Sequence, residues 1–186
     1  MTDILDAVTK ERIKRGGLLA FVQEFWDVLE SVPLILEPHM ELICAHVQAN
    51  MLFAAGNLQK ERQPWMDGAA PLQNLVIACP PGVSKTATVM NMAPAWAWTW
   101  CPSMKLGCTS YSESLAFRDA KRSFDLIFSE KYQKMWPIEI DGGERASMTY
   151  YVNNKKGSRT SVQMGAGVTG RHFHWLAADD PAKPQG

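Results

Sequence analysis

One short apolar run constrains the fold of this chain more than any other feature. Asn74-Leu75-Val76-Ile77-Ala78-Cys79 is bounded by turn residues and has the length and composition of a strand buried on both faces. Pro80-Pro81-Gly82 ends the run, and a helix is expected to begin near Lys85 and to be kinked or stopped at Pro94. A strand that leads through a tight loop into a helix favours an α/β fold.

The rest of the chain continues this alternation. Residues 105–110 are predicted to form a second buried strand, and residues 112–129 an amphipathic helix. After a polar stretch at 141–157, further strands are expected at 161–164 and 173–178. Strands that alternate with helices predict a mainly parallel sheet covered by helices on both faces, a three-layer α/β fold.

The first 55 residues are predicted to form a helical extension ahead of this core. Apolar residues recur there at the three-to-four spacing of a helix face: Leu18, Leu19, Val22, Phe25, Trp26 and Leu29, then Met40, Ile43, Val47 and Leu52. Residues 56–71, rich in Gly, Pro and charge, read as a loop. The expected domains are the extension at 1–55 and the core at 72–186.

Composition and charge exclude several classes of protein. A chain of 186 residues with 46% hydrophobic and 20% charged residues is typical of one folded globular domain. Its 19 basic and 19 acidic side chains leave no net charge, so DNA binding would require a local patch or an assembly. The four cysteines form no C-x-x-C pair, which argues against a zinc site or a disulfide scaffold. Without a signal peptide or a membrane-length apolar run, a cytoplasmic location is expected.

The segment from Cys79 to Thr86, Cys-Pro-Pro-Gly-Val-Ser-Lys-Thr, has the context of a phosphate-binding loop. In such loops, backbone N–H groups surround the phosphates, the lysine reaches the β/γ oxygens and the next hydroxyl binds Mg²⁺. The predicted nucleotide-binding residues are Pro81, Gly82, Val83, Ser84, Lys85 and Thr86. The usual pattern has Gly in place of Cys79 and Ser84, and an ordinary Pro-Gly turn before a helix remains the alternative.

A second motif, Trp175-Leu176-Ala177-Ala178-Asp179-Asp180, is an apolar strand that ends in two acids. In a Walker B element the first carboxylate, here Asp179, holds the Mg²⁺ shell, and the second, Asp180, orients or deprotonates the attacking water. Ligands bind at the carboxyl ends of strands in such sheets, and both motifs occupy such ends. A strand end with a solvated or capping carboxylate is the alternative.

Two further segments carry candidate residues. Three glycines between 165 and 170 predict a sharply bending loop, and Arg171 at its end is suited to stabilise charge on a transferring phosphoryl group. A surface arginine after a flexible turn is the alternative. The basic cluster of Lys155, Lys156 and Arg159 either touches phosphates or belongs to a solvated loop. The tryptophans at 96, 98 and 100 lie in an apolar helix and are expected in the core.

Together these motifs resemble the ATPase domain of the large terminase subunit of tailed phages. The resemblance covers nearly the whole chain and rests on the order and spacing of Phe21-Val22-Gln23-Glu24-Phe25-Trp26, His39-Met40-Glu41-Leu42-Ile43, the Pro-Pro-x-x-x-Lys-Thr loop, Pro94-Ala95-Trp96, Thr109-Ser110-Tyr111-Ser112, Leu115-Ala116-Phe117-Arg118, Gly170-Arg171 and Asp179-Asp180-Pro181.

This resemblance implies a P-loop NTPase of the additional-strand catalytic-acid class, which uses ATP and Mg²⁺ to move double-stranded DNA into a procapsid. By analogy, Lys85 and Asp180 are catalytic, Thr86 and Asp179 hold the metal, and Arg171 acts on the ATP of a neighbouring subunit in a homo-oligomeric ring. The implied partners are the portal protein and the small terminase subunit, at the procapsid portal in the host cytoplasm, with no membrane.

The chain departs from the family pattern in its loop and in its extent. Family loops often carry Arg where Gly82 stands and nearly always Gly where Ser84 stands. A degenerate module that assembles with partners without hydrolysing ATP therefore stays open, as do another P-loop DNA translocase and an unrelated α/β domain. The nuclease domain that follows in the family, and at least one strand of the core sheet, are expected to be absent from this chain.

Overall fold

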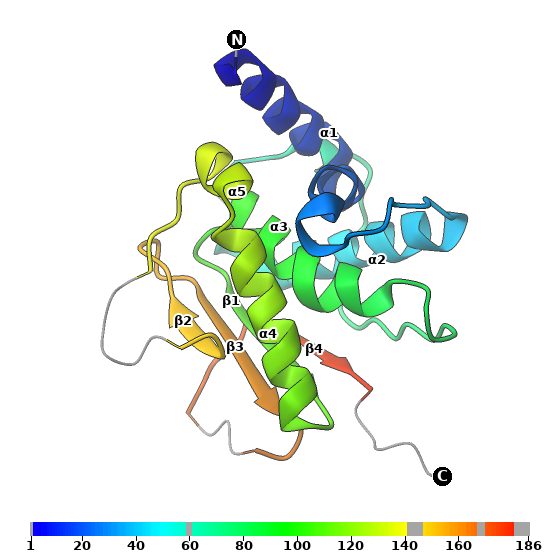
Figure 1. The fold of residues 1–186 in the computed structure, drawn as a ribbon, viewed down its shortest axis with the longest axis vertical. Helices are drawn as coiled ribbons and strands as arrows, with labels where there is room; N and C mark the ends of the chain where they lie inside the picture. The colour runs from blue at the N-terminus through cyan, green and yellow to red at the C-terminus, as the bar shows by residue number, and fades with distance from the viewer. Residues whose placement is uncertain (1, 59–60, 141–146, 167–169, 181–186) are drawn as a thin grey trace.

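The computed structural model describes residues 2–58, 61–140, 147–166 and 170–180. Two long helices come first, α1 (Thr2–Leu29), kinked at Gly17, and α2 (Pro38–Ala55). The short turns η1 (Gly56–Leu58) and η2 (Pro64–Met66) precede the π-helix η3 (Ala87–Met92) and α3 (Ala93–Trp100). Then follow β1 (Lys105–Ser110), α4 (Glu113–Ile127), α5 (Glu130–Met135), β2 (Tyr150–Val152), β3 (Ser158–Gln163) and β4 (Trp175–Asp179) (Figure 1).

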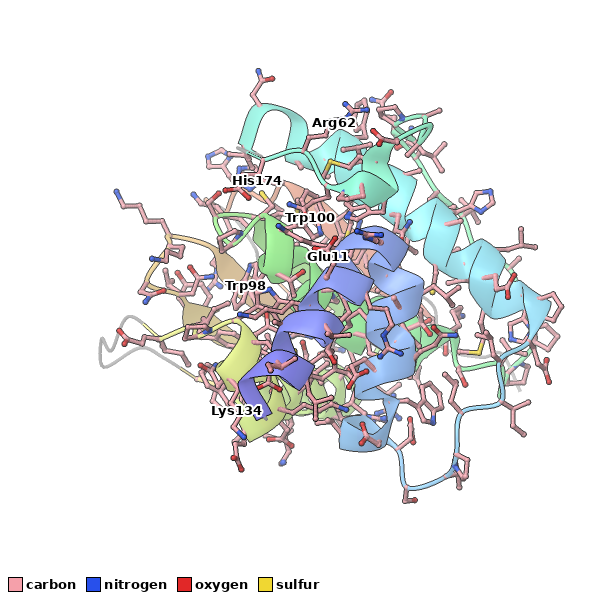
Figure 2. All side chains as sticks on the ribbon, turned by 90° about the horizontal axis from the view of Figure 1, so that it is seen from above. Glu11, Arg62, Trp98, Trp100, Lys134 and His174 are labelled. Atoms are coloured by element: carbon pink, nitrogen blue, oxygen red, sulfur yellow. The ribbon has the colours of Figure 1, made fainter. Side chains whose placement is uncertain are left out.

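Aromatic side chains fill the core between α1 and the helices nearer the sheet. Phe21 and Phe25 of α1 stack with ring centroids 4.5 Å apart, and Tyr132 of α5 packs edge-on against Phe21. The buried Tyr132 hydroxyl donates a hydrogen bond of 2.9 Å to the Ala95 carbonyl. Trp98 and Trp100 of α3, labelled in Figure 2, are only 2% and 7% exposed. The prediction that these tryptophans pack into the core is therefore confirmed.

The four strands form one sheet in the order β2-β3-β1-β4. β1 pairs in parallel with both β3 and β4, whereas β2 pairs antiparallel with β3. The predicted mixed α/β architecture with a mainly parallel sheet is therefore confirmed. The three-residue strand β2 lies inside the polar stretch at 141–157 and was not predicted, because so short a run has no periodicity of its own.

Helices pack against one face of this sheet. Cys108, Arg159 and Trp175 lie on that face, where their side chains reach the Met90 carbonyl of η3, the Asp119 carbonyl of α4 and the Asn50 side chain of α2. On the other face, the Phe173 ring lies against Gly107 of β1, and the His174 N–H donates to the Lys105 carbonyl. The helix contacts given above all lie on one face of the sheet, and they account for two of the three layers expected from the sequence.

The strand predicted at 74–79 is absent from the structure, and that prediction is wrong for this segment. Its residues alternate between half-buried and exposed, and Val76 is 91% exposed. Its side chains at 75–77 border β4 across a pocket of about 540 Å³, and no described strand pairs with it. A strand forms only where a partner satisfies its backbone N–H and C=O groups, so local apolar composition is not sufficient.

Pro94 does not stop the helix that follows the loop, which continues from Lys85 through η3 and α3. The Ala93 N–H donates to the Thr88 carbonyl, five residues earlier, as in a π-helix. Pro94 has no N–H to donate to the Met90 carbonyl four residues before it. That carbonyl instead accepts a hydrogen bond of 3.2 Å from Arg159 Nη2, so a tertiary contact replaces the missing helical one.

Candidate functional site

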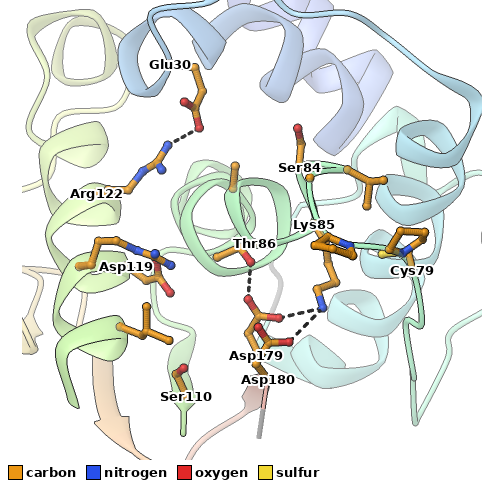
Figure 3. Close-up of a pocket in the computed structure, with 17 residues that line it drawn as sticks. Glu30, Cys79, Ser84, Lys85, Thr86, Ser110, Asp119, Arg122, Asp179 and Asp180 are labelled. Carbon is orange, nitrogen blue, oxygen red and sulfur yellow. Dashed lines mark hydrogen bonds and ion pairs between the residues drawn. The ribbon is translucent and has the colours of Figure 1, made fainter. Parts of the chain in front are cut away.

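The carboxyl end of β4 meets the start of the helix that follows the predicted phosphate loop. Lys85 Nζ lies 3.1 Å from Asp179 Oδ1 and 3.6 Å from Asp180 Oδ1 (Figure 3). Thr86 Oγ1 donates a hydrogen bond to the other oxygen of the same carboxylate, Asp179 Oδ2. The structure therefore brings together four candidate residues from the two motifs.

The loop itself contains two residues with left-handed backbone conformations. Gly82 has a φ of 85°, which costs glycine little, whereas Ser84 has a φ of 60° and carries a Cβ. A left-handed conformation costs a non-glycine residue about 1–2 kcal/mol. His39 Nε2 of α2 lies 3.3 Å from the Val83 carbonyl and holds the loop against the first turn of that helix.

These residues line a pocket of about 560 Å³, which we call the loop pocket. Its size lies in the range of small-molecule sites, about 300–1,000 Å³. Residues 79–87 supply one wall, and Ser110, Asp179 and Asp180 lie at the carboxyl ends of β1 and β4. The opposite wall is formed by α4, through Leu115, Arg118, Asp119 and Arg122.

Sequence reasoning did not assign the charged residues of α4 to this site. Arg118 Nη2 lies 3.0 Å from Asp119 Oδ1, and Arg122 pairs with Glu30, just beyond the end of α1. The signal was present in the spacing, because residues at i, i+3, i+4 and i+7 lie on one face of a helix. The contact with Glu30, 92 residues away, depends on the packing of α1 and had no such signal.

The loop pocket carries charges of both signs. Burial by itself would lower the pKa of Lys85, but its hydrogen bond to Asp179 and the charges of Asp179 and Asp180 outweigh burial and raise that pKa above its ordinary value. Burial raises the pKa of Asp119, against the opposing effect of Arg118. Lys85 is therefore firmly cationic and is the cation nearest the two acids that end the β4 motif.

The Thr86 hydroxyl and the Asp179 carboxylate suit a hard cation. Mg²⁺ in phosphate sites takes one or two protein oxygens and completes its shell with phosphate and water oxygens. Two adjacent protein oxygens fit that requirement. Within the described ranges no group of three or more His, Cys, Asp or Glu side chains is placed to hold a metal ion unaided, so a metal here would need oxygens from a ligand.

Arg171 lies apart from this cluster, whereas Asp180 lies at its exposed edge. Arg171 lies over the Tyr150 ring, 4.3 Å from its centroid, and donates to Thr160 Oγ1 at 3.3 Å, outside the loop pocket. Asp180 borders the loop pocket, but its side chain is 65% exposed and its φ is 44°. Gly167, Val168 and Thr169 of the glycine-rich loop, and Pro181, lie outside the described residues.

All four cysteines are free thiols, including Cys79 of the loop motif. No helix in the described part of the chain has both the length and the apolar character needed to cross a bilayer. Comparisons with family models, with curated proteins and with solved structures found no match to this chain.

Proposed function

We propose that this chain is an Mg²⁺-dependent ATPase domain of the kind found in large terminase subunits, in which hydrolysis drives the movement of duplex DNA. The observation that carries the proposal is the convergence of Lys85, Thr86 and Asp179 at the junction of loop, helix and strand. Coincidental motifs from segments 93 residues apart would have no physical reason to meet at one carboxylate.

Each residue has a separate task in this proposal. The Lys85 ammonium contacts the terminal phosphates, and Thr86 and Asp179 hold the magnesium ion, which offsets charge on the phosphate oxygens. Asp180 orients the attacking water, a task that its exposed side chain permits. Arg171 lies outside the loop pocket of its own chain, so a contact with nucleotide would come from another copy in a ring.

The test is titration of the chain with a fluorescent ATP analogue, with and without Mg²⁺, followed by phosphate release. Lys85→Ala should weaken nucleotide binding by about tenfold or more and remove turnover, since a charge-assisted contact contributes about 1.5–3 kcal/mol. Lys121→Ala is the control, because Lys121 is an exposed α4 lysine outside the loop pocket. Unchanged binding and turnover in Lys85→Ala would overturn the proposal.

A second candidate function is a nucleotide-binding assembly module without hydrolysis. The observation that favours it is the left-handed Ser84, which places a side chain where such loops usually carry glycine. Mg-ATP binding without turnover, even in the presence of duplex DNA and at high protein concentration, would select the module. Turnover that depends on Lys85 would select the ATPase.

A further inference from the structure

A second pocket, of about 320 Å³, collects basic side chains on the sheet face away from α4. Lys105 at the start of β1, Lys156 in the β2–β3 turn, and Arg171 and His172 ahead of β4 line it, and we call it the basic pocket. These side chains come from three separate segments of the chain, and all four residues are exposed. No aspartate or glutamate lines the pocket.

Strand register explains why these residues face away from the loop pocket. Lys105 is the partner of Ser158, and Tyr150 is the partner of Thr160, so alternate residues of three strands share this face. Arg159, between Ser158 and Thr160, points to the helical face instead. Gly107 lies on the same face as the basic pocket, and a Cβ there would come within 3.1 Å of the Phe173 ring. The glycine thus lets the segment that carries Arg171 and His172 lie close against the sheet.

The charge in this pocket is not neutralised within the described residues. Lys105, Lys156 and Arg171 have no described carboxylate within 4.0 Å. In contrast, the three cations of the loop pocket, Lys85, Arg118 and Arg122, all pair with acids. In a chain with equal numbers of acidic and basic residues, such segregation leaves a local surplus of positive charge that an anionic partner would offset.

The geometry also favours phosphate oxygens as the anionic groups. One face of the Arg171 guanidinium rests on the Tyr150 ring and Nη1 bonds to Thr160, which orients the group. Ser158 and Tyr150, which are neutral and carry hydroxyl groups, also line the pocket. The sequence cluster of Lys155, Lys156 and Arg159 divides here, because Arg159 is fully buried while Lys156 joins the basic pocket.

We propose that the basic pocket binds the phosphodiester backbone of nucleic acid. Exposed cations in water attract a single small phosphate only weakly, whereas a backbone presents many phosphates and releases counterions at each contact. The proposal deepens the proposed function and rests on it for duplex DNA as the partner, although the loop pocket and the basic pocket share no residue.

The test is fluorescence anisotropy of a labelled duplex of about 30 base pairs at several salt concentrations. Lys105→Glu/Lys156→Glu should weaken binding by about tenfold or more and reduce the salt slope by roughly two, because two phosphate contacts are lost. The matched control is Lys10→Glu/Lys14→Glu on α1, which makes the same change in net charge away from the basic pocket. If the Glu variant unfolds, Lys105→Gln/Lys156→Gln replaces it.

Three outcomes would overturn the proposal. An equal loss in both double variants would show an effect of net charge alone. Competition by inorganic pyrophosphate, at the same concentration of phosphate as the DNA, would show a site for small anions. Competition by polyglutamate as strong as that by unlabelled DNA would show a site for an acidic peptide.

Nucleotide binding is measured on the same samples. Lys105→Glu/Lys156→Glu is expected to lose DNA binding and to keep nucleotide binding. If Lys85→Ala left nucleotide binding unchanged, that result would count only against the ATPase proposal.

Discussion

Thr86 donates a hydrogen bond to Asp179, and this bond ties the first turn after the loop to the last residue of β4. The second oxygen of the same carboxylate accepts from Lys85 at 3.1 Å. One largely buried carboxylate therefore holds both Lys85 and Thr86, and its loss should displace both side chains.

Asp179→Asn should remove the Mg²⁺ dependence of nucleotide binding. The amide keeps the shape and one acceptor oxygen but lacks the charge that a divalent ion requires. The measurement is nucleotide affinity with and without Mg²⁺, with Asp125→Asn on the exposed side of α4 as the control. An Asp179→Asn chain that still bound more tightly with Mg²⁺ would exclude this carboxylate as a metal ligand.

Arg118→Ala should weaken nucleotide binding by about tenfold, whereas Arg118→Lys should recover part of the loss. Arg118 borders the loop pocket from the wall opposite Lys85, and its partner Asp119 is a neighbour on the same helix. A polyphosphate in the pocket would offer it a second anion. Isothermal titration of both variants beside Lys121→Ala measures this, and equal affinities in all three would remove Arg118 from the site.

Ser84→Gly should stabilise the chain slightly and strengthen nucleotide binding. The serine φ of 60° costs about 1–2 kcal/mol, and glycine removes this cost. The greater conformational freedom of glycine in the unfolded chain offsets about 0.5–1 kcal/mol of the resulting stabilisation. Urea unfolding and ATP titration provide the two readouts. Weaker nucleotide binding in the glycine variant would mean that the serine side chain makes a favourable contact.

The stability of the chain should fall as the pH drops through the titration of His174. Burial, and then the charge of Lys105, lower the pKa of His174 below its ordinary value of 6.5, and its Nδ1 accepts a hydrogen bond of 2.9 Å from the Lys105 N–H. The unfolded chain binds this proton more readily than the folded chain does. The free energy of unfolding therefore decreases as the pH is lowered through 6.5, and it continues to decrease until the pH reaches the lowered pKa of His174. His174→Asn keeps an acceptor without titrating, so it should lose this part of the dependence.

The control for this prediction is His46→Asn, which changes an exposed imidazole on α2 whose Nδ1 lies 2.7 Å from the Leu42 carbonyl of the same helix. Urea unfolding at about pH 8 and about pH 5.5 spans the titration. A His174→Asn chain with the same difference in stability between the two pH values as the unaltered chain would contradict the assignment.

Gly157→Ala should destabilise the fold by about 2–3 kcal/mol. A Cβ at this position would lie 2.1 Å from the Pro102 carbonyl oxygen, which belongs to the backbone and cannot move aside as a side chain can. Thermal or urea unfolding measures the change. Lys155→Ala, in the same turn but exposed, should stay within about 0.5 kcal/mol of the unaltered chain, and a Gly157→Ala chain equally stable would show that the turn relaxes freely.

Local patterns in the sequence were enough to predict several elements. The strand at Lys105–Ser110 was predicted with its bounds, because a short apolar run lies between turn residues. The helix α4 was predicted within two residues at each end, and its start is fixed by the Ser112 hydroxyl, which accepts from the Leu115 N–H. The pairing of strands could not be predicted in this way, and the error at 74–79 follows from it.

In the candidate site, too, local sequence patterns predicted some of the residues, whereas others depend on how distant segments pack. The meeting of Lys85 with Asp179 was expected on the ground that both motifs follow parallel strands of one sheet. The structure brings the two residues together although residues 74–79 form no strand. The contribution of Arg118 could have been read from helical spacing, whereas the bond between Arg122 and Glu30 depends on how two helices far apart in sequence pack. The grouping of Lys105 with Lys156 required the register of β1 against β3, which no local pattern encodes.

The fully buried Arg159 guanidinium is bonded to the Met90 carbonyl in η3, to the Asp119 carbonyl in α4 at 3.4 Å and to Ser161 Oγ at 2.7 Å. Arginine keeps its charge in proteins, and stranding a buried charge costs about 3–5 kcal/mol. The helix that follows the loop and the helix that faces it across the pocket are therefore anchored to one strand. Any rearrangement driven from the pocket should carry both helices along as a rigid block instead of opening a gap between them.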